Sequence, residues 1–318
     1  MDPIHDRLTG QDKETALVVV PWFHAMGTVG YLNNMVYGGV TMVVFPRFEP
    51  LEYLAGIEKY KATMLGGAPQ LYIPLVNLPE FEDVDLSGVN LVSSGAAPLA
   101  MPVLDKMLTA FSGTVCEAYG MTECTMGATA NPPDRKAIRQ GSVGLPVFDT
   151  KCKVADLITG EDLAPGEKGE ICIKGPQVMQ GYWNKPEETE MVLKEGWLHS
   201  GDIGTMDEEG YFYITDRQKD MIIYKGYNVY PRELEEVLFT HPDVAQCAVI
   251  GKPDLDVGEA PVAFVQLMPE VQVDDTQLME FINGQVAAYK KIREIRFLDA
   301  IPVSAAGKVL KRELREML

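Results

Sequence analysis

The chain has 318 residues, 46% of them hydrophobic and 23% charged, a composition typical of a globular protein with two or three compact units. Its formal net charge of -18 repels phosphate backbones, so nucleic acid is disfavoured as a partner, although a local pocket could still bind a nucleotide. Five scattered cysteines without a CxxC pair argue against disulfides or a zinc site, and no apolar run is long enough to span a membrane. We therefore expect a soluble, cytoplasmic protein.

The first 120 residues alternate between strand-like and helix-like segments. Strands are predicted at Ala16–Val20, Thr41–Phe45, Thr63–Leu65, Val89–Ser93 and Thr114–Ala118. Helices are predicted between them, at Gly27–Tyr37, Pro50–Tyr60, Gln70–Asn77 and Ala100–Phe111. This alternation indicates an α/β fold with a parallel, doubly wound sheet covered on both faces. Ligands of such sheets bind beyond the carboxyl ends of the strands, where the loops Ser94–Pro98 and Tyr119–Glu123 follow the last two strands.

From about Asn131 the pattern changes. Glycine and proline punctuate short strands such as Lys151–Ala155 and Glu170–Lys174, which indicates an antiparallel region that we expect to form a small β-barrel. After Asp216 a strand pair, a helix that begins near Pro231, and further strands and helices predict a small α+β unit. We therefore predict three parts: an α/β subdomain at 1–130, a β-barrel subdomain at 131–215 and a C-terminal α+β domain at 216–318.

Seven short segments carry the functional interpretation: Pro21–Gly27, Ser94–Leu99, Tyr119–Glu123, Trp197–Asp202, Asp216–Asp220, Lys225–Pro231 and Pro302–Lys308. In this order and spacing they resemble the adenylate-forming superfamily of acyl-CoA synthetases, peptide-synthetase adenylation domains and beetle luciferases. The closest resemblance is to the fatty-acyl and coumaroyl CoA ligase branch, and it extends over nearly the whole chain from Ala16 onward. Each segment alone is a weak signal, but seven in order are very hard to obtain by chance.

The resemblance implies a nucleotide at the tips of the last two strands of the α/β sheet. Tyr119 would stack on adenine, and the backbone from Gly95 onward would line the other side, because small residues let the main chain approach a flat base. Thr122 would hydrogen-bond the α-phosphate, and Glu123 would hold Mg²⁺, which prefers oxygen ligands. The implied nucleotide-binding set is Gly95, Ala96, Ala97, Pro98, Tyr119, Gly120, Met121, Thr122, Asp202 and Arg217. The alternative is that Tyr119–Glu123 is merely a turn at the end of a strand.

Asp202 and Arg217 are the residues that the resemblance places at the ribose. An ionised carboxylate offers two acceptor oxygens, which suits the two hydroxyls of a vicinal diol. The alternatives are a solvated loop aspartate and an ordinary surface ion pair, which contributes little. Trp197 and His199 lie close by in the sequence and favour an anchored, functional segment.

Lys308 is the catalytic residue that the resemblance implies, together with Thr122 and Glu123. A flexible cation at the end of a glycine-containing loop can reach both the carboxylate and the α-phosphate, where it offsets the charge of the pentacovalent centre. The alternative is a surface lysine near Lys311 and Arg312.

His24 follows the first strand, where the family has a histidine beside the acyl pocket. Gly95 and Gly120 would line the same pocket. The alternative is a histidine that packs in the core beside Trp22 and Phe23.

Lys219 matches the family's hinge, which we expect near residues 216–220. The resemblance implies adenylation with Lys308 inserted, followed by rotation of the C-terminal domain about Lys219. This rotation would bring a second loop to the tunnel through which the CoA thiol attacks, and its residues are Gly226, Tyr227 and Asn228. Gly226 would allow the thin pantetheine arm to pass closely. Ile223 departs from the pattern, because many relatives have lysine there, and this puts one expected ligand contact in doubt.

The family also has a Ser/Thr/Gly-rich loop that grips the β- and γ-phosphates, several tens of residues before the position of Ala16. The residues before Ala16 contain no such run. We therefore expect a missing N-terminal portion or a partner subunit that supplies this loop, and little or no adenylation by this chain alone.

The expected function is ligation of a small-molecule carboxylic acid to CoA, with ATP as co-substrate and Mg²⁺ as cofactor. A fatty acid is the expected acid. One alternative is transfer of the acyl-adenylate to the pantetheine of a carrier protein. Another is a non-catalytic module or subunit that binds AMP or acyl-AMP. A homodimer of this chain is the expected assembly.

Overall fold

The computed structural model describes residues 14–97, 99–271, 273–304 and 307–318. They fall into two compact units, each described here by itself. The first holds the described residues up to Ser200, with Gly204–Ile214 and Gly307, and the second holds Gly201–Ile203, Thr215–Ser304 and Lys308–Leu318. Within the described ranges, no helix is both long and apolar enough to cross a lipid bilayer. The chain changes unit at Thr215, and the division into three parts stays a prediction.

The first unit contains a seven-stranded sheet with the order β2-β1-β3-β4-β5-β6-β7. Its first five strands pair in parallel and the last two pair antiparallel. The strands are β1 (Thr15–Val18), β2 (Thr41–Val44), β3 (Met64–Gly67), β4 (Leu91–Ser94), β5 (Thr114–Tyr119), β6 (Thr129–Ala130) and β7 (Leu145–Pro146). The five parallel strands coincide with the five predicted ones to within two residues at every end, which confirms the α/β fold.

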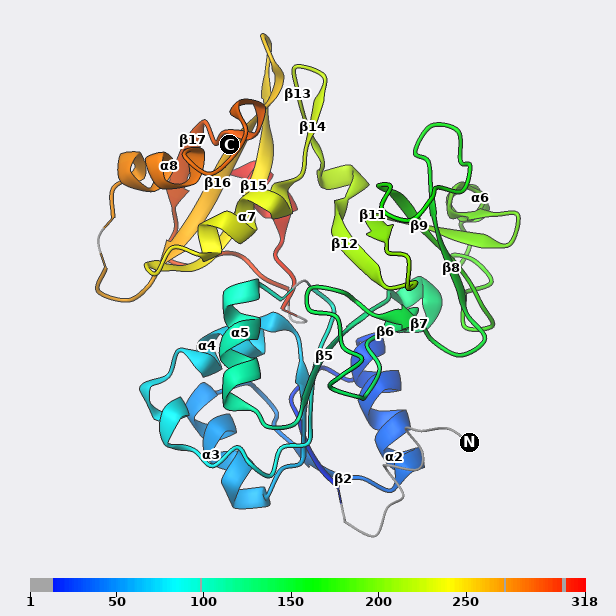
Figure 1. The fold of residues 1–318 in the computed structure, drawn as a ribbon, viewed down its shortest axis with the longest axis vertical. Helices are drawn as coiled ribbons and strands as arrows, with labels where there is room; N and C mark the ends of the chain where they lie inside the picture. The colour runs from blue at the N-terminus through cyan, green and yellow to red at the C-terminus, as the bar shows by residue number, and fades with distance from the viewer. Residues whose placement is uncertain (1–13, 98, 272, 305–306) are drawn as a thin grey trace. The chain divides into compact units, whose positions relative to one another are not determined.

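Helices cover both faces of this sheet (Figure 1). They are η1 (Met26–Asn33), α2 (Asn34–Gly38), α3 (Pro50–Tyr60), α4 (Pro69–Val76) and α5 (Met101–Ala110), with a 3₁₀ turn η2 (Pro79–Asp83). The chain steps from β1 to β2 in one direction and from β2 through β5 in the other, so right-handed crossovers place η1 and α2 on one face and α3, α4 and α5 on the other. The single helix predicted at Gly27–Tyr37 is in fact a π-helix followed by a short α-helix, and π-turns are frequent at functional sites.

A second, five-stranded sheet lies where the sequence predicts the small barrel. Its order is β10-β11-β9-β8, with β12 also paired to β11. The strands are β8 (Lys151–Ala155), β9 (Gly169–Lys174), β10 (Leu193–Lys194), β11 (Trp197–Met206) and β12 (Phe212–Arg217), and the short helix α6 (Pro186–Val192) precedes β10. Ile171, Ile173, Leu198 and Phe212 form its buried core. The segment Trp197–Asp202 is the first part of β11, which pairs with β10, β9 and β12.

The second unit is the α+β unit that the sequence predicts. Its sheet has the order β14-β13-β16-β15, with β17 paired to β16. The strands are β13 (Ile222–Tyr224), β14 (Tyr227–Val229), β15 (Val244–Asp254), β16 (Gly258–Leu267) and β17 (Glu294–Phe297), and the helices are α7 (Pro231–Phe239), α8 (Asp275–Asn283) and α9 (Lys311–Glu316). Two 3₁₀ turns, η4 (Gln218–Asp220) and η5 (Ala288–Lys290), complete it. Leu234 and Leu238 of α7 are fully buried, and burial of a leucine contributes roughly 1.5–3 kcal/mol.

A buried charge cluster joins α9, α7 and the start of this unit. The Lys311 ammonium lies 2.9 Å from the Glu235 carboxylate, and both side chains are 17% exposed. The Asp216 carboxylate is buried and accepts a hydrogen bond from the backbone N–H of Arg232 at 2.9 Å. Burial lowers the pKa of Lys311, but the Glu235 and Asp216 carboxylates outweigh this and raise the pKa above its ordinary value. Burial raises the pKa of Asp216, against the opposing charge of Lys311.

The substitution Lys311→Met should destabilise the second unit by about 3–5 kcal/mol, because it leaves two buried carboxylates without their cation. Lys252→Met is the matched control, since Lys252 pairs with Glu294 at 2.7 Å but is 40% exposed. Its cost should stay within about 1 kcal/mol. Urea denaturation followed by circular dichroism measures both, and equal losses would contradict a special role for the buried cluster.

Candidate active site

The site of the first unit begins with the parallel pairing of β4 and β5. Ser94, the last residue of β4, is the register partner of Glu117, so both strands run out at the same edge of the sheet. A Cβ added to Gly95 would lie 3.4 Å from the carbonyl oxygen of Ala118 and 2.9 Å from Cε of Met26. The segment after β1 and the end of β5 therefore both pack against Gly95, the first residue after β4.

The loop after β4 has an unusual backbone conformation. Ala96 has a φ of 69°, in the left-handed region that residues other than glycine, asparagine and aspartate seldom adopt. Such conformations cost about 1–3 kcal/mol and gather at functional sites. Ala97 is half-buried, and Pro98 lies outside the described residues. The backbone of this loop is thus set by its surroundings rather than by local preference.

The loop after β5 is folded back on itself. The backbone N–H of Met126 donates to the carbonyl of Met121 at 3.0 Å, and Thr125 and Met126 both have positive φ values, 51° and 93°. A Cβ on Gly120 would overlap the carbonyl oxygen of Met126, and a Cβ on Gly30 of the π-helix would lie 2.7 Å from the Met126 sulfur. Gly120 therefore has a local packing reason to be glycine, whether or not it also lines an acyl pocket.

Glu123 is held by a residue that the sequence analysis missed. The Tyr182 hydroxyl donates a hydrogen bond to Oε1 of Glu123 at 2.8 Å. Burial, and then the bond to this carboxylate, raise the pKa of Tyr182 to about 12, so the hydroxyl stays protonated and remains a donor at neutral pH. Thr122, beside it, is exposed at the start of the short 3₁₀ turn η3 (Thr122–Cys124).

The segment that carries Tyr182 contacts this loop at two further points. The backbone N–H of Met179 donates to the Glu123 carbonyl at 2.7 Å, and the Thr125 hydroxyl donates to the Gln177 carbonyl at 2.7 Å. Local sequence offers one weak signal for this arrangement, the glycine and proline that follow β9. The segment around Tyr182 contacts the loop after β5 through residues more than 50 positions apart in the sequence. No local sequence pattern encodes such contacts.

His24 lies on the segment between β1 and the π-helix. Its Nδ1 accepts a hydrogen bond from the backbone N–H of Met26 at 3.3 Å. Phe23 is 82% exposed and Trp22 is 42% exposed, so the aromatic neighbours of His24 do not form a core around it. This disfavours the core-packing alternative, while the assignment of His24 to an acyl pocket stays a prediction.

Asp202 and Arg217, in the second unit, are in direct contact. Nε of Arg217 lies 3.0 Å from Oδ1 of Asp202, whose side chain is only 5% exposed. The alternative of a solvated loop aspartate is wrong, because Asp202 lies inside β11 and is buried. Arg217 is 45% exposed, so one side of the pair faces solvent.

Lys308 lies in a small hairpin of the second unit. Val303 and Val309 form an antiparallel bridge, and the backbone N–H of Lys308 donates to the Ser304 hydroxyl at 3.1 Å. Gly307, just before Lys308, has a φ of 76°. The predicted segment Pro302–Lys308 includes residues 305–306, which lie outside the described residues.

A separate hairpin holds Gly226, Tyr227 and Asn228. Lys225 and Gly226 have φ values of 50° and 81°, the pattern of a type I′ turn between β13 and β14. The turn alone therefore requires glycine or a similarly tolerant residue at 226. The Tyr227 ring is 59% exposed and stacks on Tyr289 with ring centroids 5.0 Å apart. Lys219, the predicted hinge, is exposed in η4.

Comparison with known proteins identifies the family. A profile of AMP-binding enzymes matches residues 2–183, and a profile of the AMP-binding enzyme C-terminal domain matches residues 233–308. The chain belongs to the AMP-binding enzyme family. This confirms the resemblance to adenylate-forming CoA ligases that the seven segments indicate.

Members of the AMP-binding enzyme family related to this chain include ligases for both fatty and aryl acids. A long-chain-fatty-acid–CoA ligase of Bacillus subtilis is 44% identical over 303 residues, which are 95% of this chain and 54% of that protein. A feruloyl-CoA synthase of Amycolatopsis sp is 40% identical over 308 residues, which are 95% of this chain and 61% of that protein. The chain thus spans little more than half the length of these relatives.

Solved structures of the family share the fold. The o-succinylbenzoate coenzyme A synthetase of Bacillus subtilis, solved in complex with ATP and a magnesium ion, superposes with a TM-score of 0.83 at 31% identity. The match covers 97% of this chain and 63% of that structure. The α/β architecture predicted from the sequence is therefore that of an adenylate-forming enzyme.

Gly120→Ala should destabilise the first unit by about 1–3 kcal/mol, because the new methyl group overlaps the fixed carbonyl of Met126. Gly127→Ala, in the same loop, is the matched control, since nothing lies within 4 Å of a Cβ added there. Chemical denaturation compares the two variants. If both lose the same stability, the close contact at Gly120 is not what requires glycine.

Proposed function

We propose that this protein is an ATP-dependent acid–thiol ligase that joins a carboxylic acid to CoA through an acyl-adenylate. One observation carries the proposal: Gly95, directly after β4, packs against Met26, which follows β1, and against the carbonyl of Ala118 near the end of β5. In a parallel α/β sheet this edge is where the ligand binds. Membership of the AMP-binding enzyme family supports the same chemistry.

The groups proposed to bind nucleotide are described here for each unit by itself. In the first unit, Tyr119 at the end of β5 offers a ring for adenine, and the strained backbone at Ala96 offers peptide groups close by. In the second unit, the buried Asp202 carboxylate offers acceptor oxygens for a ribose diol, and its contact with Arg217 orients it. The low exposure of Asp202 supports a binding role, because a hydrogen bond to a charged group is stronger in a dry site.

The residues at Glu123 fit a magnesium ion. Tyr182 occupies Oε1 of the carboxylate with a single hydrogen bond, and a carboxylate has further lone pairs with which to bind a cation. The Thr122 hydroxyl, next in the chain, is exposed and is the proposed hydrogen-bond donor to the α-phosphate. When bound, the ion would neutralise charge on the phosphates. In this proposal Tyr182 fixes the rotamer of Glu123, and Glu123 would hold the ion.

The proposed reaction has two steps. A carboxylate oxygen attacks the α-phosphorus of ATP, and pyrophosphate leaves as acyl-AMP forms, with the Lys308 ammonium offsetting the developing charge. The CoA thiolate then attacks the acyl carbonyl carbon, and AMP leaves with the electron pair of the broken C–O bond. Gly226, Tyr227 and Asn228 are proposed to line the thiol path in the second step, after movement about Lys219.

A fatty acid is the proposed substrate, because a long-chain-fatty-acid ligase matches with 44% identity while an aryl-acid ligase matches with 40%. On the resemblance alone we propose a cytoplasmic location and a homodimer. We also propose, on the same basis, a further segment or subunit that carries the phosphate-gripping loop. Transfer to a carrier protein and non-catalytic binding of AMP are the competing functions. A thioester assay with free CoA and with a carrier protein as acceptors distinguishes them.

The 318-residue chain should bind AMP but catalyse little or no exchange of pyrophosphate into ATP. The adenosine-binding groups described above are present, whereas a Ser/Thr/Gly-rich phosphate loop is absent from the sequence. Isothermal calorimetry with AMP and a radiolabelled exchange assay measure the two properties. Vigorous exchange by this chain would contradict the need for that loop, and absence of AMP binding would contradict the proposed function.

Asp202→Asn tests the nucleotide site within the same calorimetric assay. The variant should bind AMP about tenfold more weakly, because it replaces a charged acceptor that contributes about 1.5 kcal/mol or more with a neutral amide. Asp256→Asn, at an exposed position, is the control and should leave the affinity unchanged. Equal affinities for the two variants would remove Asp202 from the site.

Mg²⁺ should increase the affinity of the unaltered chain for ATP. In Tyr182→Phe this increase should be about tenfold smaller, since the Glu123 carboxylate loses the hydrogen bond that orients it. Tyr213→Phe is the matched control, because the Tyr213 hydroxyl donates in the same way to a different carboxylate, that of Asp207, at 3.1 Å. Calorimetric titrations with ATP, with Mg²⁺ and with a chelator, give the gain for each variant. A normal gain in Tyr182→Phe would show that Tyr182 does not position a magnesium ligand.

A further inference from the structure

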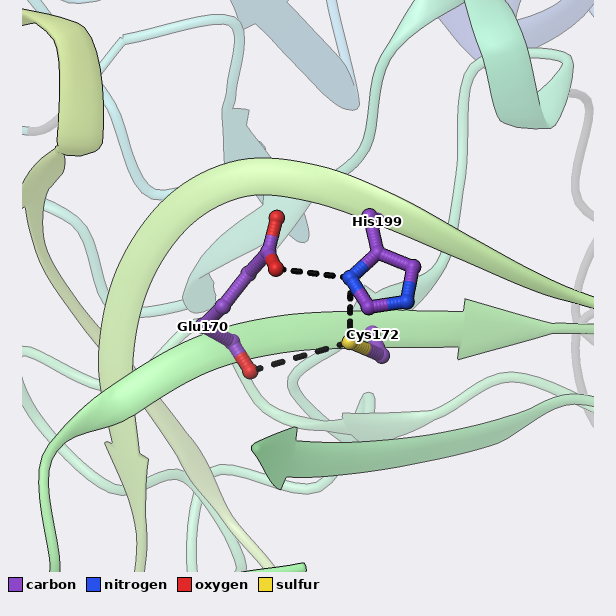
Figure 2. A group of neighbouring side chains, drawn as sticks. All are labelled: Glu170, Cys172 and His199. Carbon is purple, nitrogen blue, oxygen red and sulfur yellow. Dashed lines mark hydrogen bonds and ion pairs between the residues drawn. The ribbon is translucent and has the colours of Figure 1, made fainter. Parts of the chain in front are cut away.

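Three side chains of different chemical type meet between β9 and β11, outside the proposed nucleotide site. Figure 2 shows Glu170, Cys172 and His199 pointing toward one another. Nδ1 of His199 lies 2.7 Å from Oε2 of Glu170 and 3.6 Å from Sγ of Cys172. Glu170 and Cys172 are two residues apart in β9, so the alternation of a strand places them on the same face. All three residues belong to the first unit.

The three donor atoms are spaced as the ligands of one metal ion are. One ligand atom from each residue lies within 4.8 Å of the other two. Ligand distances of about 2.0–2.3 Å around a tetrahedral zinc ion imply a sulfur–nitrogen separation of about 3.6 Å and a nitrogen–oxygen separation of about 3.3 Å. The first separation is already present. The second requires the Glu170 carboxylate to withdraw from its present hydrogen bond to His199 by roughly 0.6 Å, within the reach of a glutamate rotamer.

The charges also suit a divalent cation. A carboxylate and a thiolate together carry two negative charges, and the imidazole binds as a neutral ligand. The nearby Lys153 ammonium is engaged elsewhere, 2.5 Å from the Asp162 carboxylate and 4.8 Å from the centroid of the Trp197 ring. Burial raises the pKa of the Cys172 thiol to about 12, so without a cation the cluster holds a neutral thiol rather than an unpaired anion.

Access to the cluster is one-sided. Cys172 is completely buried, whereas the side chains of His199 and Glu170 are 21% and 15% exposed. An ion bound by all three would thus keep one coordination position toward solvent, where water would complete a tetrahedron. The absence of a CxxC pair argued against a zinc site, but that argument considers only cysteines that are close in sequence.

We propose that Glu170, Cys172 and His199 form a binding site for a borderline-soft divalent cation such as Zn²⁺, separate from the magnesium ligands at Glu123. Thiolate and imidazole ligands favour zinc or cobalt, whereas magnesium prefers oxygen alone. On binding, Sγ of Cys172 bonds to the ion and the thiol proton passes to solvent. Nδ1 of His199 also bonds to it, with the ring proton on Nε2. The ion then joins β9 to β11 and stabilises the fold by mass action.

Titration of the purified chain with Co²⁺, under a phosphine reductant and without chelator, tests the site. One equivalent of cobalt should bind per chain and produce a thiolate-to-cobalt charge-transfer absorption in the near ultraviolet, and one equivalent of Zn²⁺ should abolish it. Cys172→Ser should lose this absorption. Cys152→Ser, a half-buried cysteine of the adjacent strand β8, is the matched control and should retain it. No charge-transfer absorption in the unaltered chain, or an equal one in Cys172→Ser, overturns the proposal.

Glu170→Gln provides a second variant that keeps the fold, because its side-chain amide retains the shape and a hydrogen bond to His199. It should weaken cobalt binding at least tenfold. In a thermal scan, Zn²⁺ should raise the unfolding temperature of the unaltered chain and of Cys152→Ser, but not that of Cys172→Ser. An equal rise in all of them would place the zinc elsewhere and contradict the proposal.

Discussion

The parallel pairing of β4 with β5 is the constraint on which the candidate nucleotide site of the first unit depends. It makes both strands end at one edge, so that their exit loops start side by side and meet the segment after β1 at Gly95. The left-handed Ala96, the folded loop at Met126 and Glu123, which accepts a hydrogen bond from Tyr182, all lie on the chain that leaves this edge. A shift in the register of these two strands would separate all of them at once.

The glycines of the candidate site have roles of different kinds. Gly120 is pressed against a backbone carbonyl, and Gly226 occupies a turn position with positive φ, so each is required by local geometry before any ligand is considered. Gly95 is different, since its nearest neighbours include the flexible end of Met26, which can move aside. A loss of activity on substitution therefore identifies a ligand contact more directly at 95 than at 120 or 226.

The positions of the parallel strands and of helix α3 are predicted well from the sequence. The parallel strands are short apolar runs, and helix α3 matches the predicted Pro50–Tyr60 in full, because proline marks its first turn. The strand position of Asp202 was not predictable, since Ser200 and Gly201 interrupt the apolar pattern and pairing partners decide the conformation. Tyr182 beside Glu123, and Cys172 beside His199, result from pairings across 59 and 27 residues, which local periodicity does not encode.

A crystal structure of the chain grown with AMP tests the central claim most directly, because it locates the base itself. The adenine ring should lie against the Tyr119 side chain with the backbone of Gly95–Ala97 on its other face. An ordered AMP bound anywhere else, with the Tyr119 ring uncovered, would contradict the claim that the exit loops of β4 and β5 form the nucleotide site.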